Sequence, residues 1–156
     1  MRPPAPASAP PSAASTDPLR ERLAGLGRRI GGREAPHRRA LEEARQRAQA
    51  LHAQVAAALD AFHAGVSEAG GEPLGVEISP VRGDDKHVRA VEFELKRGRH
   101  KAIVTVKSRG EVTLVGPFKA GATEGPCATF PFDAERELEA ALAGFLERFL
   151  EEGATP

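Results

Sequence analysis

The sequence predicts an α+β fold. A disordered Pro/Ala-rich tail and a long N-terminal helical segment precede an antiparallel β-meander of four to five strands, and a C-terminal amphipathic helix packs on one sheet face. Three observations support this order. Apolar residues recur every three or four positions between residues 19 and 66, which is typical of helices. They alternate with polar residues over 74–130, which is typical of strands, and helical spacing returns after residue 133. The 156 residues suit a domain of ordinary size.

The first 16 residues carry prolines at positions 3, 4, 6, 10 and 11, mixed with alanine and serine. This composition has too few apolar side chains to form a core. Residues 1–16 are therefore expected to form a disordered, partly polyproline-like tail.

A helical region is expected over residues 17–71, and its first part is a short helix at 17–30. Asp17 is a suitable N-cap, and Pro18 fits the first helical position. Gly31 and Gly32 are expected to end this helix. Its apolar residues recur at helical spacing and form what we call the N-terminal stripe: Leu19, Leu23, Leu26 and Ile30.

A second, longer helix is expected over residues 36–69, between Pro36 and the Gly70-Gly71 pair. Its apolar residues form a narrow strip close to a heptad repeat, called the 41–66 seam: Leu41, Ala44, Ala48, Leu51, Val55, Leu59, Phe62 and Val66. About 33 helical residues span roughly 50 Å, which is longer than a small sheet needs. Part of the seam is therefore expected to pack on residues 18–30 folded back, or on a second chain.

Two tight turns fix the expected strand register. A two-residue loop at Gly98-Arg99 pairs Phe93 with Val104, and a three-residue loop at 108–110 pairs Val104 with Leu114. Both loops independently place the apolar residues on one face. The opposite face, with glutamates, lysine and threonines, is expected to meet water. A fourth strand is expected around Val76 and Ile78.

Residues 116–131 are expected to be irregular, because Gly116-Pro117 and Gly125-Pro126 interrupt the alternation, with a short strand possible at 127–130. Asp133 caps the final helix, whose broad apolar stripe suits the cover of a sheet. Residues 74–152 are expected to form one compact domain together with the long helix.

Composition excludes several classes of protein. The sequence contains no run of about 18 apolar residues and no apolar segment after Met1, so neither a membrane span nor a secretory signal is expected. With a single cysteine, no intrachain disulfide is possible. No closely spaced metal-ligand pair occurs, so neither a metal nor a cofactor is expected. A cytoplasmic location and no membrane association follow from these features.

The leading functional expectation is a small, non-enzymatic cytoplasmic interaction or adaptor module. It would self-associate or bind a partner protein through the 36–69 helix, because an exposed apolar seam is normally covered. The candidate partner-binding residues lie along that seam: Leu41, Leu51, Val55, Leu59 and Phe62.

An alternative is a nucleic-acid-associated protein that uses a basic hairpin at 96–109. Arginine and lysine neutralise phosphates. However, successive turns of a meander lie at opposite sheet ends, roughly 20 Å apart, and the outward face offers no aromatic residue for base stacking. The candidate residues are Lys96, Arg97, Arg99, His100, Lys101, Lys107 and Arg109.

A second alternative is an enzyme that uses the 116–127 loop. This loop holds a possible nucleophile, Cys127, a cation, Lys119, and a carboxylate, Glu124. A reactive cysteine needs a nearby cation, histidine or helix N-terminus, and no histidine lies near Cys127 in the sequence. No catalytic residue is therefore assigned.

Overall fold

The computed structural model describes residues 17–83, 89–122 and 125–154. The tail expected at 1–16 lies outside these residues. The chain divides into two compact units, 1–36 and 37–156.

The fold is α+β, as the sequence predicts. A six-stranded antiparallel sheet has the order β1-β3-β4-β5-β6, and β2 also pairs with β3. The elements are α2 (Pro18–Glu68), β1 (Glu77–Ile78), β2 (Arg82–Gly83), β3 (Ala90–Arg97), β4 (His100–Lys107), β5 (Glu111–Lys119), β6 (Cys127–Pro131) and α3 (Glu135–Ala154).

Helix α2 begins as expected but does not break where expected. The Asp17 carboxylate accepts a hydrogen bond from the backbone N–H of Leu19 at 3.1 Å, which is an N-cap. The expected interruption at Gly31-Gly32 is not observed, and α2 continues through these glycines and through Pro36. Glycine and proline lower helix propensity but do not forbid helical backbone angles.

The predicted strand register is confirmed. Phe93 pairs with Val104, and Val104 pairs with Leu114, so the apolar residues of three neighbouring strands share one face. The turns rely on Gly98 and Gly110, whose φ angles are +58° and +97°. This left-handed region favours glycine over other residues.

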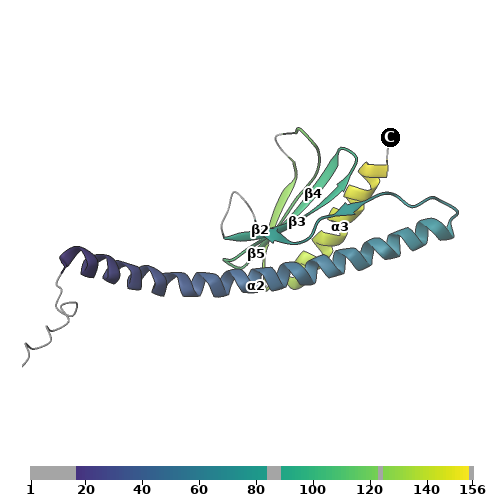
Figure 1. Cartoon of the computed structure of the whole chain (residues 1–156). Coiled ribbons are helices and arrows are strands. Elements are labelled where there is room, and N and C mark those ends of the chain that lie inside the picture. Colours follow the sequence, from purple (N-terminus) through teal and green to yellow (C-terminus); the bar gives the residue numbers. More distant parts are fainter. Residues whose placement is uncertain (1–16, 84–88, 123–124, 155–156) are drawn as a thin grey trace, which may run out of the picture. The chain divides into compact units, whose positions relative to one another are not determined.

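The core of residues 37–156 lies between that apolar face and two helical segments. Figure 1 shows α3 lying across one face of the sheet, and residues of α2 from Ala44 to Leu59 join the same core. The edge of the His52 ring contacts Phe93, with ring centroids 5.1 Å apart. The Arg47 guanidinium lies over the Phe132 ring, 4.6 Å from its centroid.

The opposite face is polar but only partly open to water. Glu94 forms ion pairs with Arg82 at 3.3 Å and with Lys101 at 3.7 Å. The hydroxyls of Thr113 and Thr129 hydrogen-bond at 3.0 Å. Neighbouring side chains on a continuous sheet shield one another, so Thr113 is 5% exposed despite its outward position.

The region 116–131 is more regular than expected. Strand β5 continues past Gly116-Pro117 as far as Lys119, with a register shift in its pairing to β4. A Cβ added to Gly116, whose φ is +107°, would lie 2.9 Å from the backbone oxygen of Lys101. A Gly-Pro pair is therefore accommodated by a bulge, not by the end of the strand. The strand possible at 127–130 is present as β6.

Candidate functional site

The 41–66 seam is occupied by the chain's own core, which contradicts the expectation that its residues face a partner. Leu51, Val55 and Leu59 are 7%, 0% and 6% exposed, and the partly buried Leu41 and Phe62 pack against the same core. One helix is about 10 Å wide, whereas the three central strands β3, β4 and β5, at about 4.8 Å spacing, form a wider face. Helix α3 alone cannot cover the apolar face, so residues of α2 cover the rest.

The N-terminal stripe, by contrast, is open. Within the 1–36 unit, its leucines are 64%, 57% and 39% exposed, and Ile30 is 36% exposed. Arg22 and Arg29 border the stripe at g positions of the heptad, and Arg33 takes the d position after Ile30, so a charge ends the stripe there. An apolar strip bordered by arginines is an amphipathic surface suited to association.

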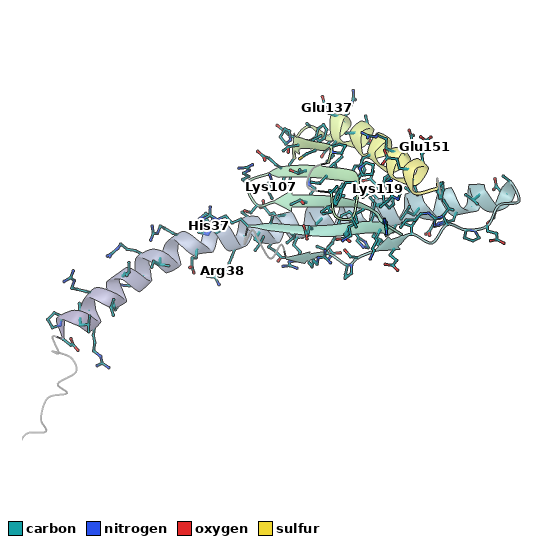
Figure 2. All side chains as sticks on the ribbon, turned by 90° about the horizontal axis from the view of Figure 1, so that it is seen from above. His37, Arg38, Lys107, Lys119, Glu137 and Glu151 are labelled. Carbon is teal, nitrogen blue, oxygen red and sulfur yellow. The ribbon has the colours of Figure 1, made fainter. Side chains whose placement is uncertain are left out.

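The basic hairpin does not form one surface. The Lys96 and Lys101 pair lies on the polar face of the sheet, whereas the Arg97 and His100 pair lies on the helix-covered face, because side chains alternate along strands. Figure 2 shows Lys107 and Lys119 toward opposite ends of the sheet. The structure therefore separates the seven candidate nucleic-acid ligands into two groups around two different turns.

Of the first group, Arg97, Arg99 and His100 line the β3–β4 cleft, a depression of about 920 Å³ beside the Gly98-Arg99 turn. The register aligns Arg97, His100 and Lys119 in one row across three strands. Arg97 Nε donates a hydrogen bond to the Gly153 carbonyl at 2.7 Å, so this guanidinium caps the C-terminus of α3. Glu152 also lines the cleft, and the helix C-terminus adds partial negative charge.

The second group lines the β4–β5 cleft, a depression of about 500 Å³ at the other end of the sheet. Its cationic side chains are Arg89, Lys107 and Arg109, joined by the imidazole of His37 from α2. Arg109 pairs with Glu111 at 2.9 Å. The remaining lining residues are small or carry hydroxyls: Ala40, Ala90, Thr105 and Ser108.

Two of the three candidate loop residues lie at the ends of different strands. Lys119 ends β5, Cys127 is exposed at the start of β6, and Glu124 lies outside the described residues. In the described part of the chain, no three His, Cys, Asp or Glu side chains group as metal ligands. His52 and His63 donate hydrogen bonds to the backbone oxygens of Ser79 and Leu74, at 3.0 Å and 2.8 Å, so both imidazoles have structural partners.

The sequence indicated only some of the residues that line the β4–β5 cleft. Lys107 and Arg109 were candidates, but His37 and Arg89 were not, because they are 70 and 18 residues away from Lys107. Only the packing of α2 beside the sheet brings His37 to this turn.

None of the helices within the described ranges combines the length and apolar content needed to cross a membrane. Comparison with known proteins adds no functional information: no family model matches the chain, and no curated protein or solved structure shows significant similarity to it.

Proposed function

We propose that this chain is a small, non-enzymatic cytoplasmic interaction module that self-associates through its N-terminal stripe. The observation that supports this most strongly is the exposure of Leu19, Leu23, Leu26 and Ile30 on one helical face. Association would then involve the part of α2 that precedes the buried 41–66 seam.

The glycines within residues 18–36 weaken this part of the helix, which supports a partner that covers its apolar stripe. Gly27, Gly31 and Gly32 have nothing within 4 Å of the position a Cβ would take, so no contact within the chain requires glycine there. Each glycine in a helix interior is about 1 kcal/mol less favourable than alanine. Because most helical stability in proteins comes from packing of an apolar face, this glycine-rich part of α2 is expected to need contacts that cover its stripe.

Charge complementarity at the flanking g and e positions favours a second copy in parallel orientation. The stripe residues are spaced by four, three and four, as in the a and d positions of a heptad. In a parallel pair, Arg29 at a g position lies beside Glu34 at the following e position of the second copy. An antiparallel pair instead places Arg22 beside Arg29 of the second copy, twice, which is repulsive.

Solution mass tests the proposal, measured by light scattering on the full chain. We expect wild type at twice the 16.5 kDa chain mass and Leu23→Asp at the chain mass. Ala24→Asp is the matched control, because it adds the same charge one position away, outside the stripe, and it should leave the mass at the wild-type value. If wild type is monomeric, or if Leu23→Asp and Ala24→Asp have equal effects, self-association through the stripe is wrong.

A charge exchange tests the orientation. Arg29→Glu should weaken a parallel pair, because it faces Glu34 of the second copy, and adding Glu34→Arg should restore the association. In an antiparallel pair, Arg29→Glu would relieve the repulsion from Arg22 and strengthen association. Strengthening by the single variant would therefore contradict the parallel arrangement.

A further inference from the structure

The β4–β5 cleft shows a second feature that is independent of the N-terminal stripe. Three cationic side chains, Arg89, Lys107 and Arg109, converge on it from a loop, a strand and a turn. Among the described lining residues there is no carboxylate. Arg109 is already paired with Glu111, whereas Arg89 and Lys107 add two further like charges that repel one another, so the group is stabilised when an anion binds between them.

We infer that the β4–β5 cleft binds the phosphate group of a small phosphorylated molecule. Guanidinium and ammonium groups form charge-assisted hydrogen bonds with phosphate oxygens. The hydroxyls of Thr105 and Ser108 and the imidazole of His37 line the same cleft and supply further hydrogen-bonding groups.

The size of the cleft fits a small ligand. Its volume of about 500 Å³ lies within the range of about 300–1,000 Å³ that is typical of small-molecule sites. Ala40 and Ala90 give it an apolar part beside the cations, which suits the organic portion of a phosphate ester.

The surrounding charges disfavour an extended polyanion. Glu92 pairs across the sheet with Thr105, and Glu111 pairs with Lys107. A nucleic-acid strand leaving the cleft along this face would therefore meet carboxylates.

The β3–β4 cleft provides an internal comparison. It also gathers cations, but Arg97 is engaged with the C-terminus of α3, and Glu152 lines the same depression. Each cleft is thus lined by three arginines or lysines, but only the described lining of the β3–β4 cleft includes a carboxylate. Their residues supply matched variants for an experiment.

Titration of the ¹⁵N-labelled full chain with inorganic phosphate, and separately with AMP, tests the inference by NMR. Potassium chloride keeps the ionic strength constant. We expect saturable shifts of the Arg89, Lys107, Ser108 and Arg109 amides with both probes. Arg89→Gln/Lys107→Gln should weaken binding about tenfold or more, whereas Arg99→Gln/Lys119→Gln, which removes the same charge from the other cleft, should not. The dispersion of the same spectra reports whether each variant is folded.

Three outcomes would overturn the inference. The first is the absence of saturable shifts in the folded wild-type chain. The second is an equal loss of affinity in both double variants, which would indicate a response to total charge. The third is binding of a single-stranded oligonucleotide without binding of phosphate or AMP, which would assign the basic residues to nucleic acid.

Discussion

Replacement of Leu51 by alanine separates the two possible roles of the 41–66 seam. If Leu51 contacts a partner, its truncation weakens association and leaves the folded chain intact. If Leu51 belongs to the core, as the structure shows, truncation destabilises the fold itself. Its side chain is 7% exposed and lies in one cluster with Val55 and Phe93, so little relaxation into the gap is available.

The expected magnitude follows from that burial. Leucine-to-alanine changes in cores cost about 3 kcal/mol in the free energy of unfolding, from lost transfer energy and the cavity left behind. With a urea dependence of about 2 kcal/mol per molar, the unfolding midpoint should fall by about 1.5 M.

Urea unfolding followed by circular dichroism measures this shift, at a protein concentration where the chain is monomeric. Leu23→Ala is the matched control, because Leu23 is 57% exposed and its truncation should change the free energy of unfolding by less than about 0.5 kcal/mol. If Leu51→Ala leaves the midpoint unchanged, or if both variants shift it equally, the assignment of the seam to the core is refuted.

Two further predictions concern the sheet and the end of α3. Gly116→Ala should lower the free energy of unfolding by more than about 1 kcal/mol, because the φ of Gly116 is +107° and an added Cβ would lie 2.9 Å from a backbone oxygen. Gly144→Ala is the control on α3, where an added Cβ meets no atom within 4 Å, and it should be neutral or stabilising. Thermal melts that rank the two variants in the opposite order would contradict this. Arg97→Ala should increase amide hydrogen exchange over the last turn of α3, because it removes the donor to the Gly153 carbonyl. Arg99→Ala is the control and should leave this exchange unchanged. Equal exchange in the two variants would exclude the capping role of Arg97.

The strand register was predictable because two independent constraints agree. The turns around Gly98 and Gly110 each set a pairing, and each pairing places the same apolar residues on one face. A shift of one residue would expose that whole face, so the alternative registers are strongly disfavoured.

The role of the seam was not predictable from periodicity. The spacing of Leu51, Val55 and Leu59 indicates an apolar helical face but not what covers it. The answer depends on the width of the sheet relative to α3, which emerges only when the strands are assembled. The same limit applies to the N-terminal stripe, whose spacing resembles the seam while its exposure differs.

The structure groups the candidate residues differently from their order in the sequence. Lys119 was assigned to a loop, but a bulge extends β5 so that Lys119 pairs with His100. His37 joins Lys107 through the packing of α2 near the sheet end. Both groupings arise from contacts between residues distant in sequence, which local patterns do not encode.

The mass of the wild-type chain across a concentration series, measured by sedimentation equilibrium, tests the central proposal most directly. Association through the N-terminal stripe predicts a mass that rises with concentration from 16.5 kDa toward twice that value. A mass that stays at 16.5 kDa throughout the series would contradict it.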